Sequence, residues 1–310
     1  MTQAGDRSAP GPTTARSPYA ARLATGCGAL VALCFCLIVL GALVRAHQAG
    51  LACPDWPRCF GQWIPELNLR VAFEVTHRAL AGSVSLLFVS LFVLALWRPE
   101  TRHTTAIFAA AAALLCTQVL LGALTVWQLL APWTVTAHLL TGNAFAATLL
   151  LGALALRDGP RPARTPLEAA ARRRVFAAAL LLVAQMALGG LVASRHAGLA
   201  CPEWPDCREG LWFPAWQGPV GLHLLHRANG YALVLGLAAA AQAGRRAPAL
   251  RRVTRLALLL GLAQVAVGVA NVLLELRVEV TGLHSALAAA LVLSVTWAAR
   301  EAWLGRPERG

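Results

Sequence analysis

The sequence contains no lysine and little charge of either sign. All 27 basic residues are arginine, the acidic residues number 14, and only 13% of the 310 residues are charged. Soluble globular domains carry charge on about a quarter of their residues. Because 58% of the chain is hydrophobic and its mean hydropathy is +0.61, the composition excludes an ordinary soluble domain and indicates an integral membrane protein.

The shortage of acid leaves a net charge of +13. Proteins that bind nucleic acid gather basic residues on one face, whereas these arginines lie in short segments between long apolar runs. An arginine-only set in a chain rich in Ala, Leu, Gly and Pro is typical of biased codon usage. We therefore expect membrane lipid, and no nucleic acid, around this protein.

Eight apolar runs are long enough to span a bilayer, which takes about 20 mostly apolar residues. Four fall in each half of the chain, at matching places. They cover residues 23–44, 74–97, 104–127, 133–156, 174–193, 222–243, 253–274 and 280–302. The predicted fold is all-α and integral to the membrane, with eight transmembrane helices as two parallel four-helix bundles related by pseudo-two-fold symmetry.

Arginine marks the cytoplasmic side of a membrane protein. It is frequent before the first run, after the second, fourth and sixth runs, and at the C-terminus, but scarce in 128–132 and 275–279. We expect a bacterial cytoplasmic membrane protein with both termini in the cytoplasm. The polar start lacks a signal-peptide cleavage pattern. The expected divisions are a disordered cytoplasmic tail 1–20, an N-terminal four-helix half 21–157, a cytoplasmic linker 158–173, a C-terminal four-helix half 174–304 and a cytoplasmic tail 305–310.

The chain also repeats a motif. Residues 41–59 read GALVRAHQAGLACPDWPRC and residues 189–207 read GGLVASRHAGLACPEWPDC, an offset of 148 (189 minus 41). The shared AGLACP-[DE]-WP-x-C predicts an internal duplication. Residues that the copies share then indicate a common role, and residues that differ indicate specialisation.

Each copy carries two cysteines in a long loop that is expected outside the cell. Because the exterior is oxidising, and two prolines and a tryptophan between the cysteines favour a tight turn, we predict the disulfides Cys53–Cys59 and Cys201–Cys207. Such short bridges act either as structural staples or as reducible redox pairs, and both interpretations remain open. Two cysteines in a loop make a poor zinc site.

One histidine lies inside each of the second, fourth, sixth and eighth runs: His77, His138, His226 and His284. Ionisable groups inside a membrane are costly and usually functional. Because these four lie at one depth, we interpret them as ligands, and two imidazoles per half suit the axial positions of a haem iron. Arg78 and Arg227 follow two of them and are expected either to pair with haem propionates or to anchor the helices at the interface.

The two halves differ at one telling position. Three residues before His77 stands Glu74, whereas three residues before His226 stands His223. Glu74 shares a helix face with His77, where a carboxylate can act as acid, base or proton relay. The alternative is an ordinary first-turn acid that the helix dipole favours. The first half is therefore predicted to carry chemistry and the second to be an electron-transfer site.

Together these features resemble the haem A synthase family, membrane enzymes that oxidise the C8 methyl group of haem O to the formyl group of haem A. The resemblance covers nearly all of the chain after residue 20. It rests on the eight spans, the duplicated four-helix unit, the four histidines, the E-x-x-H-R motif at 74–78 and the paired cysteines.

The resemblance implies a role for each site residue. Glu74 is the expected catalytic residue, His77 and His138 are the expected axial ligands of the substrate haem O, and His226 and His284 those of a permanent haem b iron. The disulfides match extracytoplasmic bridges of the family, the first of which is proposed to assist electron transfer. The implied reaction is two successive hydroxylations of the methyl carbon. The implied partners are haem O synthase, cytochrome oxidase assembly proteins and an electron acceptor that the sequence does not identify.

Two other functions remain as alternatives. A DsbB-like membrane thiol oxidoreductase explains the cysteine pairs but leaves four buried histidines without a role. A non-catalytic di-haem b electron carrier or haem transporter explains the histidines but not the difference between Glu74 and His223.

Overall fold

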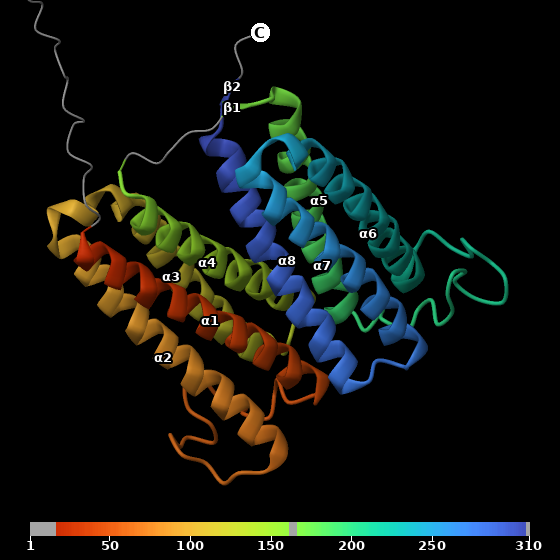
Figure 1. Ribbon diagram of the computed structural model, residues 1–310. Helices are drawn as coiled ribbons and strands as arrows, with labels where there is room; N and C mark the ends of the chain where they lie inside the picture. The colour runs from red at the N-terminus through yellow and green to blue at the C-terminus, as the bar shows by residue number, and fades with distance from the viewer. Residues whose placement is uncertain (1–16, 161–165, 308–310) are drawn as a thin grey trace, which may run out of the picture.

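The computed structural model describes residues 17–160 and 166–307. Within that part, eight long helices carry most of the chain (Figure 1). They are α1 (Pro18–Ala46), α2 (Leu69–Trp97), α3 (Thr105–Trp127), α4 (Pro132–Asp158), α5 (Ala169–Ser194), α6 (Gly218–Ala243), α7 (Pro248–Leu273) and α8 (Val278–Leu304). Two 3-10 turns, η1 (Pro99–Thr104) and η2 (Gly244–Arg246), precede α3 and α7. The all-helical prediction is confirmed.

Most of these helices extend beyond the apolar runs. α1 begins inside the predicted tail 1–20 and α5 begins inside the predicted linker 158–173, because a polar or capped first turn lengthens a helix without adding hydropathy. The side chain of Ser17 caps α1 and that of Asn68 caps α2. Residues 1–16, 161–165 and 308–310 of the predicted tails and linker lie outside the described residues.

Seven of the eight long helices in the described ranges are long and apolar enough to cross a membrane, so the chain is a multi-pass membrane protein. The helix that falls short of this measure is α6. Its first turns hold His223, His226, Arg227 and Asn229, which lower its hydropathy. Composition therefore supports seven of the eight predicted spans.

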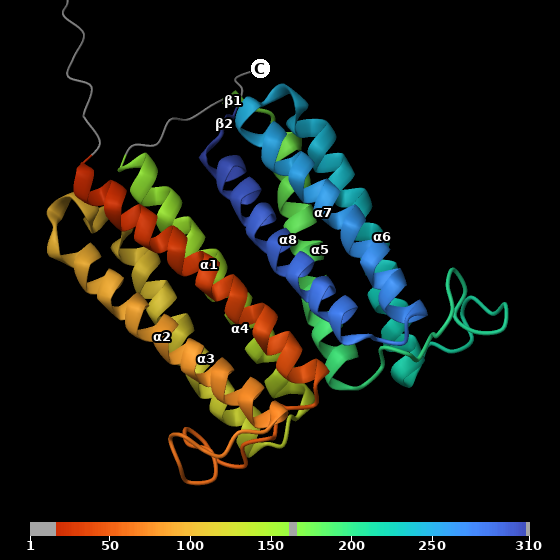
Figure 2. The same ribbon diagram turned by 60° about the horizontal axis from the view of Figure 1, so that its bottom comes forward.

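The helices pack as two four-membered rings. In the first ring, α1 and α3 each contact both α2 and α4; in the second, α5 and α7 each contact both α6 and α8. The rings meet where α1 and α4 contact α8 and where α4 contacts α5. Two long loops, the first loop (residues 47–68) and the second loop (residues 195–217), emerge at the same end of the molecule (Figures 1 and 2).

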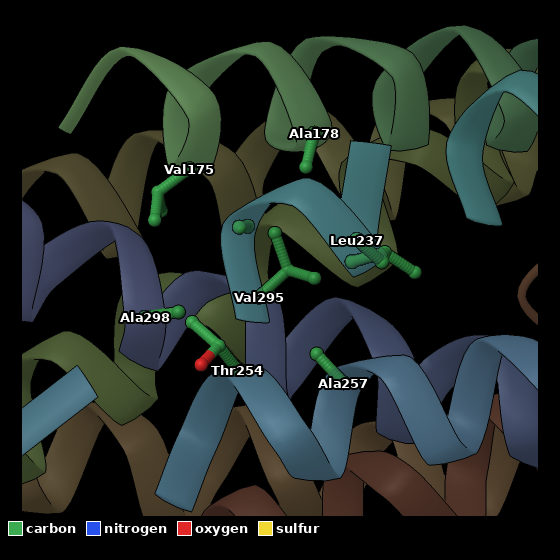
Figure 3. A pocket seen from close by; sticks show the side chains of 8 residues that line it. Val175, Ala178, Leu237, Thr254, Ala257, Val295 and Ala298 are labelled. Atoms are coloured by element: carbon green, nitrogen blue, oxygen red, sulfur yellow. The ribbon is translucent and has the colours of Figure 1, made fainter. Parts of the chain in front are cut away.

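Apolar side chains fill both rings between the middle of the helices and the end opposite the loops. Phe88, Phe108 and Phe145 form an aromatic cluster in the first ring. In the second ring a cavity of about 10 Å³ remains, which is room for about one water. Figure 3 shows its mostly apolar lining, in which the Thr254 hydroxyl already donates to the Leu250 carbonyl oxygen. Nearby, strands β1 (Pro166–Leu167) and β2 (Arg306–Pro307) pair in parallel. This cavity is too small for a ligand much larger than water.

Candidate functional site

Each of the four predicted ligand histidines lies on an even-numbered helix and packs against a glycine of the helix before it. A Cβ added at the glycine would lie between 3.0 and 3.3 Å from Cε1 of the imidazole. A side chain larger than hydrogen would therefore crowd the ring, and glycine lets the two helices close around it. The four pairs are Gly41–His77, Gly122–His138, Gly189–His226 and Gly268–His284.

The histidines form one pair in each ring. Helices α2 and α4 stand across the first ring from each other, as α6 and α8 do across the second. Nδ1 of His77, His138 and His284 is buried without a hydrogen-bond partner. Imidazoles paired across a four-helix ring, with ring nitrogens unpaired among the described residues, fit the two axial positions of a haem iron.

Glu74 lies one helical turn before His77 on α2 and is only 5% exposed. Its Oε1 accepts a hydrogen bond from Nη2 of Arg78 at 2.5 Å, and its Oε2 accepts one from the backbone N–H of Cys53 at 3.0 Å. Because residues i and i+3 share a helix face, the carboxylate lies on the same face of α2 as the imidazole. It is held from one side by its own helix and from the other by the first loop.

His223 occupies the equivalent place in the second ring and is 4% exposed. Its Nδ1 accepts a hydrogen bond from the backbone N–H of Cys201 at 3.4 Å. Both rings therefore have a hydrogen bond from a cysteine N–H of the loop to this helix position, although the side chain is glutamate in one and histidine in the other. Arg227 donates instead to the carbonyl oxygens of Cys201 at 2.7 Å, Glu203 at 2.8 Å and Asp206 at 3.0 Å. Among the described residues, the hydrogen bonds of the second arginine therefore all go to carbonyl oxygens of the second loop.

Arg78 binds the first loop in the same manner. Its Nη1 donates to the carbonyl oxygens of Asp55 at 2.8 Å and Arg58 at 2.6 Å. Both arginines thus fasten a loop over the end of a ring. Their predicted contact with haem propionates stays a prediction.

Both predicted cysteine pairs are bonded in the structure, with Cα–Cα distances of 4.7 Å for Cys53–Cys59 and 4.3 Å for Cys201–Cys207. Inside the first loop, the Asp55 carboxylate accepts the backbone N–H groups of Gly61 at 2.8 Å and Phe60 at 2.7 Å. These hydrogen bonds, that of Gly61 first, hold the pKa of Asp55 below its usual range. Each loop is therefore a closed, cross-linked turn.

A family model described as cytochrome oxidase assembly protein, COX15-CtaA, matches residues 24–72 and 68–296. The chain belongs to this family. The matched residues include Glu74, the four histidines and both cysteine pairs.

Curated relatives in several bacteria carry the name haem A synthase. The relative from Shouchella clausii is 31% identical over 275 residues, covering 84% of this chain and 89% of its own length. The relative from Shewanella oneidensis is 29% identical over 304 residues, covering 84% and 90%. The relative from Rhizorhabdus wittichii is 27% identical over 338 residues, covering 92% and 95%. The predicted resemblance to haem A synthases is confirmed, and it extends over both rings of this COX15-CtaA member.

Three glutamines contact the histidines and are not among the residues predicted from the sequence: Gln118, Gln185 and Gln264. They lie on α3, α5 and α7, four residues before the glycine that packs against a histidine. Four residues are about one helical turn, so each amide lies above its glycine on the same helix face. The signal is the spacing Q-x-x-x-G, which recurs at 118–122, 185–189 and 264–268.

Proposed function

We propose that this protein is a haem A synthase, which oxidises the C8 methyl group of haem O to the formyl group of haem A. The observation that carries the proposal is the asymmetry at Glu74. Both rings have a histidine pair, glycines beside the imidazoles and a loop fastened by an arginine, but the first ring has a buried carboxylate where the second has His223. Membership of the COX15-CtaA family and relatives named haem A synthase support it.

The two rings have different roles in this proposal. His226 and His284 hold a resident haem b, which supplies a one-electron redox centre when bound. His77 and His138 receive the substrate haem O. Arg78 and Arg227, which follow a ligand in sequence and lie near the loops, remain candidates for contacts with haem propionates.

The reaction requires two successive oxidations of the methyl carbon. The first gives an alcohol, and the second gives a geminal diol that loses water to become the aldehyde. When water supplies the oxygen, each oxidation exchanges a C–H bond for a C–OH bond and releases two protons and two electrons, the electrons passing to an electron acceptor. Glu74 is the group placed to accept the protons, since Arg78 and the Cys53 N–H fix its carboxylate on the His77 face. General acid–base catalysis of this kind contributes about 10²–10⁴-fold to a rate.

The first loop contributes by covering the carboxylate. The backbone of Cys53 contacts Glu74, and Arg78 ties the loop at Asp55 and Arg58. A covered site limits the access of water to a partly oxidised substrate. The disulfide Cys53–Cys59 closes this cover and is the bridge that the family resemblance associates with electron transfer.

α6 is the eighth membrane span in this proposal. Its polar groups find partners inside the protein: His226 and Asn229 contact Gln185, and Arg227 contacts the second loop. Internal partners are the condition under which a helix with such side chains can lie in a bilayer. The arginine distribution favours both termini and the segments that follow α2, α4 and α6 in the cytoplasm, with both cysteine loops outside a bacterial cytoplasmic membrane.

The contacts between helices also support a pseudo-two-fold arrangement. Exchanging α1–α4 for α5–α8 converts the contact of α1 with α8 into that of α5 with α4, and leaves the contact of α4 with α8 unchanged. Such parallel repeats arise from duplication of an even number of spans. Haem O synthase and cytochrome oxidase assembly proteins are the expected neighbours.

The test is to co-express the chain with a haem O synthase in a bacterial host that makes no haem A, and to separate the extracted haems by chromatography. We expect haem A only when both proteins are present, and a low-spin b-type Soret band in the purified protein. Bound haem without haem A would favour a di-haem carrier. Absence of haem, with transfer of electrons from a dithiol to quinone, would favour a thiol oxidoreductase.

A further inference from the structure

An amide lies beside the imidazole at three of the four histidines. Nε2 of Gln118 is 3.4 Å from Nε2 of His138, and Nε2 of Gln264 is 3.1 Å from Nε2 of His284. An amide NH₂ can only donate, so the imidazole nitrogen that it contacts is an acceptor and the ring is neutral. A neutral imidazole is the form that binds a metal ion.

The third amide is fixed more firmly. Nε2 of Gln185 lies 3.2 Å from Nδ1 and 3.3 Å from Nε2 of His226, while its Oε1 accepts a hydrogen bond from Nδ2 of Asn229 at 2.8 Å. A Cβ added at Gly230 would lie 3.2 Å from the Gln185 amide nitrogen. The chain therefore provides both a partner and room for this side chain.

Gln118, like Gln185, has room for its amide beside a glycine. A Cβ added at Gly142 would lie 2.9 Å from the Gln118 amide nitrogen, so this amide also rests on a glycine. Oε1 of Gln118 and of Gln264 is buried without a partner, as is Nδ1 of His138 and of His284. An amide carries both a donor and an acceptor. The same side chain can thus donate to a free ring nitrogen or accept from the ring N–H when the other nitrogen binds iron.

The fourth histidine departs from this pattern. Four residues before Gly41, which packs against His77, α1 carries Leu37. Leu37 packs on the apolar core of the first ring and has no donor or acceptor to offer. Among the described residues, Nδ1 of His77 is buried without a partner and no glutamine lies beside the ring, which packs against Gly41.

We propose that Gln118, Gln185 and Gln264 are positioning residues that keep their histidines on a haem iron, and that His77 is built to hold iron more loosely. Outer partners that hydrogen-bond a ligand histidine fix its ring and raise its basicity. The inference rests on the proposed function and deepens it. His77, on the helix that also carries Glu74, would then release iron more readily than the three histidines that have a glutamine beside them.

The first test removes an amide from the second ring. The substitution Gln264→Leu uses the residue that the chain itself places at position 37, so it suits an apolar helix. Loss of an outer partner typically costs 10–100-fold in metal affinity. We expect haem to leave the purified variant about 10-fold or more faster, trapped by apomyoglobin, and carbon monoxide to bind the reduced haem. Gln242→Leu, an exposed glutamine at the far end of α6, is the matched control and is expected to behave as the unaltered protein.

The reciprocal test adds an amide to the first ring. The first ring is filled by adding haemin, and carbon monoxide binding to the reduced protein is measured with and without Leu37→Gln. We expect the substitution to lower the fraction of haem that binds carbon monoxide. Haem loss and carbon monoxide binding that are unchanged in Gln264→Leu, or carbon monoxide binding that is unchanged in Leu37→Gln, would overturn the inference. A protein that binds no haem would overturn the proposed function as well.

Discussion

The first and second loops are built alike but fastened to different side chains. Each is closed by a disulfide of the same sequence separation. In each, backbone carbonyl oxygens accept hydrogen bonds from an arginine of the helix that follows the loop, Arg78 in α2 or Arg227 in α6. In the first loop the Cys53 N–H meets a carboxylate, whereas in the second the Cys201 N–H meets an imidazole. The duplication has thus kept the covering structure and changed the group beneath it.

The two rings differ a second time in the same place. Three histidines have a glutamine beside them, and the one without it, His77, is also the one that shares a helix face with Glu74. Both departures from the repeated pattern therefore fall on the α1–α2 pair. Under the proposed function, the features that the two copies share would form the haem-binding scaffold, and the features in which they differ would locate the chemistry.

Removing a histidine from each ring is expected to have the largest effect. Under the proposed function, His284→Ala would remove an axial ligand of the haem b in the second ring, so the low-spin b-type Soret band of the purified protein should be almost lost. His138→Ala should leave that band in place and reduce haem A formation. Absorption spectra and haem extraction of the two variants check this, and identical spectra would argue against separate roles for the rings.

Removing the arginines compares the two loops directly. Arg78→Ala leaves the buried carboxylate of Glu74 without its charged partner (their side chains are 17% and 6% exposed), which costs about 3–5 kcal/mol for a buried pair. Arg227→Ala leaves only carbonyl oxygens unpaired, at about 1–3 kcal/mol. Chemical denaturation in detergent measures both free energies of unfolding. Equal losses would mean that the Glu74 contact adds nothing to the first loop.

Filling the glycine contacts is expected to cost less. Gly41→Ala places a Cβ 3.0 Å from Cε1 of His77, and overpacking of this kind costs about 1–3 kcal/mol. Gly82→Ala on α2 is the matched control, because nothing lies within 4 Å of its added Cβ and alanine favours a helix by about 0.5–1 kcal/mol. Thermal unfolding should separate the two, with Gly41→Ala lower and Gly82→Ala higher than the unaltered protein.

The smallest expected effect is the pH dependence of the first loop. Because the folded protein lowers the pKa of Asp55, the hydrogen bonds to Gly61 and Phe60 stabilise the loop above the ordinary aspartate pKa, and this stability is lost as the pH falls through the lowered value. Asp55→Asn should remove the dependence. Hydrogen exchange of the two amides between neutral pH and about pH 3 measures it, and protection that is flat in the unaltered protein would contradict it.

The sequence predicted much of the fold because hydropathy and repetition are properties of the chain itself. All eight helices lie where the apolar runs are, and the two cysteine pairs follow from the repeated motif. The helix ends were less accessible, since the cap at Asn68 and the polar start of α5 add turns without hydropathy. α6 shows the limit of hydropathy as a signal for a membrane span, because the polar residues of the candidate site lower the mean hydropathy of the helix.

The four histidines and Glu74 could be selected as candidates from the sequence, but the groups that contact them could not. Histidines inside apolar runs stand out, whereas Gln118, Gln185 and Gln264 look like ordinary polar residues until the structure brings them to an imidazole from another helix. The contact of Glu74 with the Cys53 N–H joins residues 21 apart in sequence. Contacts of this kind depend on how the loop folds back, which no periodicity encodes.

The most direct test of the central claim compares Glu74→Gln with His223→Gln, each co-expressed with a haem O synthase, by chromatography of the extracted haem. If the carboxylate under the first loop carries the chemistry, Glu74→Gln should lower haem A formation by about 100-fold or more while keeping its b-type spectrum, and His223→Gln should still make haem A. Haem A at undiminished levels in Glu74→Gln, or an equal loss in both variants, would contradict it.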